Sequence, residues 1–420
     1  MKKDESLMKG KPFSIPKSLV WQAYEMVRKN QGACGYDGQS IEEFETDRDR
    51  NLYKIWNRMS SGTYFPPPVL LQEIPKNDGG TRILGIPTVG DRIAQATVKI
   101  FLEGPLEKVF DEDSYGYRPG RSPVHALEAA RQRVWKYAWA IDIDIKGFFD
   151  NIRHDLVLKA LKHHCKEHWV ELYVERWLRA PQIDREGKMQ ERKKGTPQGG
   201  VISPLLANLY LHYGLDCWMR RNFPKIEFER FADDAILHCK SETEADKVLQ
   251  GLKGRMEEIG LELHPDKTKK VFCGGPAERN RDKLCEFKFL GFDFKTRTLK
   301  DPRGRLFRKM APGPSVKAMK GITAFIKGWN LHRATALSLE DISIRYSTVV
   351  RGWINYFARY SYRNFAYHIW SVLQSRLIKW YMAKFKVTQN VAERKLGRIR
   401  KFTPTMFPHW YMLNGGSRAV

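Results

Sequence analysis

The sequence predicts an α+β fold followed by a helical, strongly basic C-terminal region. Residues 64–295 alternate short apolar, strand-like runs with amphipathic helical stretches. Residues 301–420 hold 22 Lys and Arg against 4 Asp and Glu, a net charge of +18 out of +25 for the whole chain. This excess predicts a region that binds a polyanion, most simply nucleic acid; a merely solvated basic domain is the alternative.

The N-terminal part is expected to begin with helices and a hairpin. Residues 17–60 have a helical pattern, interrupted by the loop NQGACGYDG (Asn30–Gly38), which contains three glycines. Alternating apolar residues over 64–87, on either side of the turn Asn77–Gly80, predict a β-hairpin.

Helices are expected next over 89–110 and 123–137, followed by a buried strand, AWAIDIDIKGFF (Ala138–Phe149). The segment KKGTPQGGVISPLLANLYLHYGL predicts a glycine-rich loop that opens a helix. EFERFADDAILHC then predicts a strand, a turn and a second strand.

The remaining elements lead into the basic region. An amphipathic helix is expected over 243–260 and a short strand at KFLGFDF. DPRGR (301–305) and APGP (311–314) indicate the boundary, and helices are expected from about residue 312.

Other features of the sequence predict a soluble cytoplasmic protein. The six cysteines form no CxxC pair and no zinc-type spacing, which predicts reduced thiols. The N-terminus lacks the apolar core of a signal peptide, and no run reaches transmembrane length, so no membrane partner is expected.

Two pairs of aspartates lie where apolar residues are expected. Asp142 and Asp144 share one face of the strand that starts at Ala138, while Asp233 and Asp234 interrupt an apolar run. Carboxylates that converge from two strands can hold two divalent ions, about 3.5–4 Å apart, for phosphoryl transfer, and Mg²⁺ prefers oxygen ligands. The alternative is a solvated turn beside an incidentally acidic strand.

The order of the motifs resembles that of bacterial group II intron-encoded reverse transcriptases, also called maturases, in a form that lacks an endonuclease domain. The resemblance covers about residues 28–400. It rests on NQGACGYDG, EIPKNDGGTRILGIPTVGDRIAQ, SYGYRPGRS, DIDIKGFFD, GTPQGGVISPLLANLYL, FADD, LELHPDKTK, FLGF and VVRGWINYF.

The resemblance implies a right-hand polymerase fold. Fingers and palm, with a ferredoxin-like antiparallel sheet, would occupy residues 1–300, including an N-terminal extension motif at 28–38. An all-α thumb, or maturase X domain, would occupy 301–400. The tail at 401–420 would be a DNA-binding remnant.

The same resemblance assigns the metal site. Asp144, Asp233 and Asp234 would be the catalytic, metal-binding triad, joined by the backbone carbonyl of Ile145, with Asp142 as the fallback for Asp144. The expected cofactor is a pair of Mg²⁺ ions, with Mn²⁺ as a substitute.

The resemblance also assigns the dNTP site. Lys76 and Arg82 would hold the triphosphate, and Phe149 would be a steric gate against a 2′-OH. Gln198 would contact the nucleotide, and Lys267 would donate a proton to the leaving pyrophosphate. A core phenylalanine and a solvated lysine are the alternatives for Phe149 and Lys267.

A larger set is expected to contact RNA or the template–primer duplex. For Arg118 and Arg121, a purely structural role is the alternative. The tryptophans of the basic region are expected to lie in the core more often than to stack on bases. The set is Asn30, Gly32, Arg118, Arg121, Gly199, Lys317, Lys320, Lys327, Arg345, Arg351 and Lys379.

The function implied is an RNA-directed DNA polymerase of a group II intron, acting in the bacterial cytosol. Its partners would be intron RNA, an RNA template, a DNA primer or target, and dNTPs, with the choice between monomer and homodimer open. A domesticated host reverse transcriptase, an RNA-binding splicing factor with vestigial polymerase motifs, and an RNA-templated RNA polymerase are the alternatives. The chain departs from the family in having FADD, with Phe231 in place of the usual Tyr.

Overall fold

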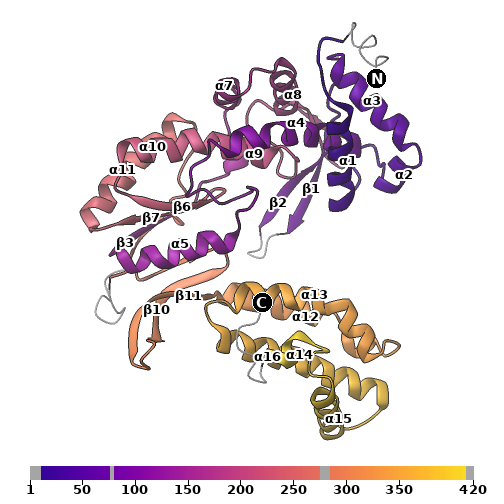
Figure 1. Cartoon of the computed structure of the whole chain (residues 1–420), viewed down its shortest axis with the longest axis vertical. Helices are drawn as coiled ribbons and strands as arrows, with labels where there is room; N and C mark the ends of the chain where they lie inside the picture. Colours follow the sequence, from indigo (N-terminus) through magenta and orange to yellow (C-terminus); the bar gives the residue numbers. More distant parts are fainter. Residues whose placement is uncertain (1–10, 76–79, 275–283, 413–420) are drawn as a thin grey trace, which may run out of the picture. The chain divides into compact units, whose positions relative to one another are not determined.

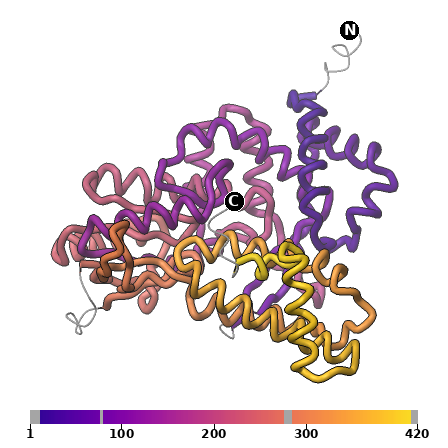
Figure 2. Tube along the Cα trace, turned by 60° about the horizontal axis from the view of Figure 1, so that its bottom comes forward, coloured from indigo at the N-terminus to yellow at the C-terminus, as the bar shows by residue number. Residues whose placement is uncertain are grey.

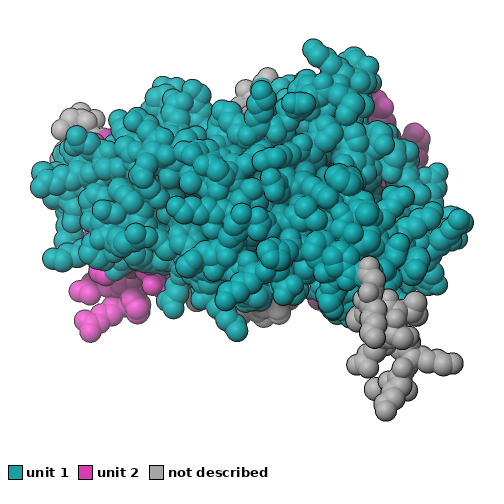
Figure 3. Space-filling view, turned by 90° about the horizontal axis from the view of Figure 1, so that it is seen from above, with its two compact units in different colours: residues 1–126, 141–269 teal, residues 127–140, 270–420 magenta. Residues whose placement is uncertain are grey.

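The computed structural model describes residues 11–75, 80–274 and 284–412 (Figure 1). The chain forms two compact units (Figure 3). Unit 1 comprises Met1–Ala126 and Ile141–Lys269, and unit 2 comprises Leu127–Ala140 and Lys270–Val420. The domains expected from the resemblance, which divide at residue 300, stay a prediction.

Unit 1 begins with the expected helices. They are α1 (Lys17–Asn30), α2 (Ile41–Glu45) and α3 (Arg48–Ser60). Val20, Ala23, Tyr24 and Val27 are buried at helical spacing on one face of α1, and α1 packs against α4 (Val89–Glu107).

The loop between α1 and α2 is anchored to α4. Arg92 donates hydrogen bonds to the carbonyls of Gln31, at 3.2 Å, and Ala33, at 2.9 Å. A Cβ at Gly35 would come within 2.6 Å of the Thr88 backbone, so the close approach requires glycine there.

The expected hairpin is present as β1 (Val69–Pro75) and β2 (Thr81–Ile86), antiparallel, with Leu70 opposite Ile86. The tip of its predicted turn lies outside the described residues. With β4 (Gln182–Ile183) and β5 (Met189–Gln190) the hairpin forms a sheet of order β2-β1-β4-β5.

A second sheet has the order β6-β7-β3-β8. Its strands are β3 (Trp139–Ile143), β6 (Glu227–Phe231), β7 (Asp234–Cys239) and β8 (Lys269–Phe272). The strand predicted over Ala138–Phe149 is too long: β3 ends at Ile143, and α6 (Phe148–Asn151) follows Gly147, whose φ of 56° turns the chain.

The remaining helices of unit 1 are α7 (His154–His164), α8 (His168–Arg179), α9 (Ser203–Leu211), α10 (Cys217–Asn222) and α11 (Glu242–Glu258). A five-residue π-helix, η1 (His212–Asp216), joins α9 to α10. Such π segments are rare and occur often near functional sites. Figure 1 shows α11 beside β7, and the two elements are in contact.

Unit 2 contains a three-stranded sheet, of which the sequence predicts only a short strand at KFLGFDF. KFLGFDF is divided between β9 (Glu286–Phe289) and β10 (Phe292–Lys300), and APGP lies within β11 (Leu306–Pro314). The order is β11-β10-β9, with antiparallel pairing. Leu290 and Gly291 both have positive φ, so they form the hairpin turn between β9 and β10. α5 (Pro123–Lys136), in the expected position, joins the two units along the chain.

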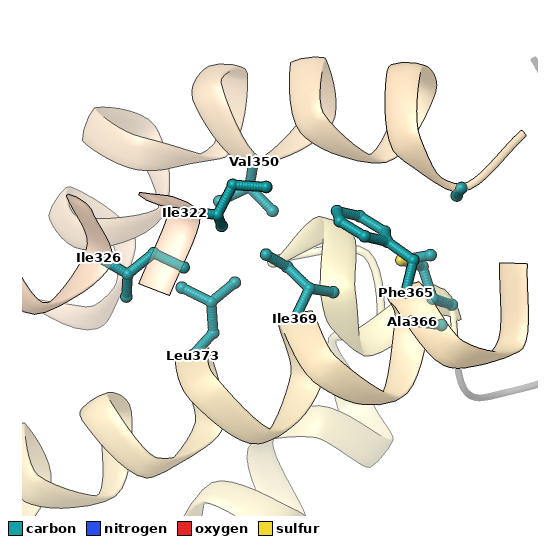
Figure 4. Packing of buried hydrophobic residues seen from close by; sticks show 9 residues of the cluster. Ile322, Ile326, Val350, Phe365, Ala366, Ile369 and Leu373 are labelled. Atoms are coloured by element: carbon teal, nitrogen blue, oxygen red, sulfur yellow. The ribbon is translucent and has the colours of Figure 1, made fainter. Parts of the chain in front are cut away.

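The helical part of unit 2 begins at Val316, as expected, and is traced in orange and yellow in Figure 2. It contains α12 (Val316–Gly328), η3 (Leu331–Arg333), α13 (Leu339–Phe357), α14 (Tyr362–Phe385), α15 (Gln389–Phe402) and α16 (Pro408–Met412). One core cluster includes Ile322, Val350 and Ile369 (Figure 4). A second cluster buries Trp380 and Trp410, which confirms the prediction that these tryptophans are core.

In the part of the chain that the structure describes, no helix is both long and apolar enough to cross a membrane. All six cysteines lie in that part, and each is a free thiol.

Candidate active site

The turn between β6 and β7 places Asp233 and Asp234 at one end of the second sheet. Phe231 pairs with Asp234, and Ala232 has a φ of 59°, a left-handed conformation that is unusual for alanine. Segment 113–117 lies against this turn: the Arg230 N–H donates to the Asp113 carbonyl and the Tyr115 N–H to the Arg230 carbonyl, both at 2.8 Å. A Cβ at Gly116 would overlap the Ala232 backbone nitrogen.

A buried ion pair supports the same turn from beneath. Arg230 is fully buried and donates two hydrogen bonds to Asp216, at 2.8 and 2.6 Å. The same guanidinium donates to Asn208 Oδ1, at 3.1 Å, and to the Ala232 carbonyl, at 2.9 Å. Arg230 thus joins helix α9, segment η1 and the strained turn through one rigid, multidentate group.

Asp144 lies just beyond the end of β3. Its carbonyl accepts a hydrogen bond from the His264 N–H at 2.8 Å. Its carboxylate forms an ion pair with Lys267, at 3.2 and 3.3 Å to the two oxygens. β3 and β7 are neighbours in the sheet, and Asp144 lies close enough for its charge to act on both carboxylates of the β6–β7 turn.

The three carboxylates perturb one another. Desolvation by surrounding protein, followed by the charges of Asp233 and Asp144, raises the pKa of Asp234 to about 7, even though part of this residue reaches the surface. Lys267 opposes that shift. Burial and the charge of Asp144 also raise the pKa of Asp233, while Arg82 and Arg230 act in the opposite direction. The fold therefore holds three carboxylates close together although their charges repel one another.

Three mutually repelling aspartates provide the oxygen donors that divalent cations prefer, and a cation would relieve their repulsion. Within the described ranges, however, no three His, Cys, Asp or Glu side chains are already arranged to hold a metal ion. The residues fit a divalent ion in chemistry and charge, provided that Lys267 releases Asp144 and the carboxylates reorient. Ile145 is buried and bridges to Leu263, and its role as a carbonyl ligand stays a prediction.

Two of the residues predicted to bind dNTP meet beside the carboxylates. The Arg82 Nε donates a hydrogen bond to Gln198 Oε1 at 2.8 Å, across a sequence separation of 116 residues. The backbones are also in contact, because the Gly85 N–H donates to the Gln198 carbonyl at 2.8 Å. Arg82 is exposed and close enough to influence the charge of Asp233. Lys76, the other predicted triphosphate ligand, lies outside the described residues.

Phe149 is buried, with 8% of its surface exposed, and its ring packs edge-on against Phe148, with the centroids 5.3 Å apart. Its carbonyl accepts a hydrogen bond from the Thr196 N–H at 2.8 Å. This bond joins the predicted gate to the loop that carries Gln198.

The residues predicted to contact nucleic acid in unit 1 fall into different environments. Asn30, the last residue of α1, and Gly32, on the α1–α2 loop, are both exposed. Gly199 has a φ of 122°, and a Cβ there would lie 2.6 Å from the Gly85 carbonyl oxygen, so its close approach is to protein backbone. Arg121 is half-buried and donates to the Glu112 carbonyl at 3.1 Å.

Arg118 corrects one expectation. Its guanidinium is buried, forms an ion pair with Glu107 at 2.7 Å, and donates to the carbonyls of Asp111 and Ser114. These are the contacts of a structural arginine, which was the alternative, so we remove Arg118 from the proposed nucleic-acid surface.

The six cations predicted to bind RNA in unit 2 are all exposed, on α12, α13 and α14. They are Lys317, Lys320, Lys327, Arg345, Arg351 and Lys379.

Sequence reasoning missed two components of the site. Tyr117 has a φ of 56°, is 53% exposed and packs its ring 6.3 Å from that of Phe231. Burial of its hydroxyl, followed by the charge of Asp233, raises the pKa of Tyr117. The other missed component is the Arg230–Asp216 pair. A charged residue inside an apolar strand was the available signal for Arg230, whereas Tyr117 gave none.

Comparisons with known proteins show the family to which the chain is similar. Residues 74–294, just over half of the chain, match the family described as "Reverse transcriptase (RNA-dependent DNA polymerase)". Residues 319–398 match the family described as "Group II intron, maturase-specific domain".

Individual relatives point the same way. Over 298 residues the chain is 30% identical to Protein YkfC of Escherichia coli (strain K12), covering 60% of this chain and 78% of YkfC. Over 236 residues it is 34% identical to the group II intron-encoded protein LtrA of Lactococcus lactis subsp. cremoris, covering 56% of this chain. The match spans only 38% of the length of LtrA.

Proposed function

Because this chain belongs to the reverse transcriptase family and contains a group II intron maturase-specific domain, we propose that it is the RNA-directed DNA polymerase of a group II intron. It extends a DNA primer on an RNA template with dNTPs. It also binds intron RNA to assist splicing and retrohoming.

The observation that carries the proposal is the convergence of Asp144, Asp233 and Asp234 with the Arg82–Gln198 pair. Carboxylates that repel one another suit divalent cations, and an exposed guanidinium beside them suits a triphosphate. No single residue of this set is specific for a polymerase, but the combination of carboxylates at the end of one sheet with Arg82 of β2 and the Gln198 loop matches the needs of nucleotidyl transfer.

Reverse transcriptases use divalent metal ions, and we propose two Mg²⁺ here, replaceable by Mn²⁺, held by Asp144, Asp233 and Asp234. The chemistry supplied by such a pair is activation of the primer 3′-OH and neutralisation of the transition-state and pyrophosphate charge. Arg82 holds the triphosphate, with Lys76 as a further predicted contact, and Gln198 positions the nucleotide. Lys267, which is paired with Asp144 here, would be available to protonate the pyrophosphate if a divalent ion were held by that carboxylate.

Unit 2 supports the RNA-binding part of the proposal. Its six exposed predicted cations lie on α12, α13 and α14, and RNA contact is assigned to these charges. Trp353 and Trp380 pack in or against the core clusters, whereas Phe325, Tyr362, Tyr367 and Phe385 are exposed on the same helices. Binding through phosphates would weaken steeply with added salt. The bacterial cytosolic location and the oligomeric state remain predictions.

The test is primer extension by the full chain on an RNA template, with and without Mg²⁺. We expect dNTP incorporation that stops when EDTA is added. The assay is repeated with Mn²⁺ in place of Mg²⁺. A protein that binds RNA tightly but incorporates no nucleotide with Mg²⁺ or with Mn²⁺ would overturn the polymerase proposal and favour the splicing-factor alternative.

Replacing Phe149 with Val tests the gate. We expect the ratio of kcat/KM for rNTP over dNTP to rise about 10–100-fold, because a smaller side chain leaves room for the 2′-OH. Phe148→Val is the matched control: it removes the ring that packs against Phe149, so it should lower stability without changing the ratio. An unchanged ratio in Phe149→Val, in single-turnover incorporation, would contradict the gate assignment.

A further inference from the structure

Unit 1 also contains a basic site, separate from the carboxylate cluster. It is a cavity of about 740 Å³ at the N-terminal end of α7, the C-terminal end of α8 and the segment that follows β5. Five cations and two carboxylates, Asp155 and Glu191, line it, an excess of three positive charges with His154 neutral. The cations are Arg153, Arg179, Arg192, Lys193 and Lys194.

Arg192 is the unusual member of this group. Only 9% of its surface is exposed, and within the described residues its Nε and Nη2 atoms are buried without a hydrogen-bond partner. Burial lowers its pKa to about 10, against the opposing charge of Asp150. A buried guanidinium with two unsatisfied donors is costly, and native proteins rarely retain such a group without a partner.

The wall of the cavity is preorganised by hydrogen bonds and by close packing of its backbone. His154 Nε2 is bonded to the Gly195 carbonyl at 2.7 Å, and Lys194 Nζ donates to Asn151 Oδ1 at 2.8 Å. Gly195 has a φ of 81°, and a Cβ there would lie 2.7 Å from the carbonyl oxygens of Phe149 and Asp150. The segment that presents Arg192 is therefore fixed closely against the chain beneath it.

The helix end adds to the attraction for anions. Residues Arg153, His154 and Asp155, at the start of α7, line the cavity, and the N-cap position, Arg153, makes no side-chain cap bond. The positive end of the helix dipole favours a bound anion here, and the Asp155 carboxylate, which is paired with Arg153 at 2.6 Å, already accepts hydrogen bonds from N–H groups of this turn.

We propose that this cavity, the Arg192 pocket, binds a phosphate group through the Arg192 guanidinium and the surrounding lysines. The planar guanidinium of an arginine can donate two hydrogen bonds to one phosphate group at the same time. The volume admits more than a single free ion, so the phosphate belongs either to a nucleic-acid backbone or to a free phosphate compound. The site lies outside the catalytic cluster, and its test measures binding, so it can fail or succeed independently of polymerase activity.

The first measurement is thermal unfolding of the full chain in chloride and in inorganic phosphate at equal ionic strength. We expect phosphate to raise the Tm of the wild type by about 2–4 °C but to leave Arg192→Gln unchanged. In chloride, the Tm of Arg192→Gln should be at least that of the wild type, because the substitution removes an unpaired buried charge. If Arg192 had only a structural role, the substitution would lower the Tm instead.

Two further variants complete the design. If Arg192→Gln fails to fold, Lys193→Gln takes its place in the test. Lys193 is exposed, so this variant should fold normally and show a smaller Tm increase in phosphate than the wild type. Lys166 is exposed and lies between α7 and α8, at the ends of both helices away from the cavity. Lys166→Gln removes the same charge and should retain the full shift.

The second measurement distinguishes the two sources of phosphate. Fluorescence anisotropy of a labelled single-stranded RNA over a salt series gives the slope of log K against log salt. A slope reduced by about 0.7 in Arg192→Gln, but not in Lys166→Gln, identifies a backbone phosphate. An unchanged slope together with the Tm shift identifies a free phosphate compound. The absence of both effects overturns the proposal.

Discussion

Replacing Asp234 with Asn should abolish DNA synthesis and at the same time raise the melting temperature of the metal-free protein. Synthesis should fall by about 10³-fold or more, because the carboxylate is proposed to hold the metal ions on which nucleotidyl transfer depends. Stability should rise because Asp234 is repelled by both Asp233 and Asp144. After allowance for screening of a partly exposed group, the gain should be about 1 kcal/mol.

The measurements are single-turnover primer extension with Mg²⁺ and thermal unfolding in EDTA. Glu257→Gln, at an exposed position of α11, is the control for the change from carboxylate to amide and should alter neither result. Retained synthesis by Asp234→Asn would remove Asp234 from the catalytic set. A lower Tm would show that the three carboxylates are not in repulsion.

Replacing Arg230 with Met should destabilise unit 1 by about 3–5 kcal/mol, because Asp216 would be left as an unpaired buried charge. The double variant Arg230→Met/Asp216→Leu should recover most of this loss, since a buried ion pair can often be replaced by apolar residues of similar volume. Synthesis should not recover. The Ala232 carbonyl would still lack its donor, and the turn that carries Asp233 would be free to relax from its left-handed conformation.

Urea unfolding followed by circular dichroism gives the free energies, and hydrogen exchange of the β6 and β7 amides reports on unit 1 alone. Arg221→Met removes an exposed guanidinium from α10 and should change stability by less than about 0.5 kcal/mol. If the double variant synthesises DNA at the wild-type rate, the pair serves stability only, and its positioning role is wrong.

The parts of the fold that were predictable are those with local signals. The β1–β2 hairpin has alternating apolar residues on both sides of a turn, and the β6–β7 strands flank two aspartates that cannot continue an apolar run. Helices α1, α4 and α11 have apolar residues at helical spacing. The resemblance assigns each aspartate of the carboxylate triad to a motif, and their role as a metal site stays a prediction.

The errors have a common physical origin in contacts that local residue preference and periodicity do not reveal. APGP was assigned to a boundary because proline and glycine usually end strands, yet β11 pairs with β10 over nine residues, which outweighs local preference. Arg118 was assigned to nucleic acid, but Glu107 and two carbonyls enclose its guanidinium. Neither the Tyr117–Phe231 contact nor the Arg230–Asp216 pair leaves a periodic pattern that a sequence could display.

The π-helical segment η1 gives this run of helix a position that tolerates a change in length. A π turn closes through i→i+5 hydrogen bonds, so it holds about one residue more than an α turn. Removing one residue between His212 and Asp216 would therefore convert it to an α turn and leave the direction of α10 nearly unchanged. Arg220 of α10, which pairs with Asp111 and Asp113 at 2.8 Å, would keep its place. A deletion inside α9, by contrast, would rotate everything that follows by about 100° and turn Asp216 away from Arg230.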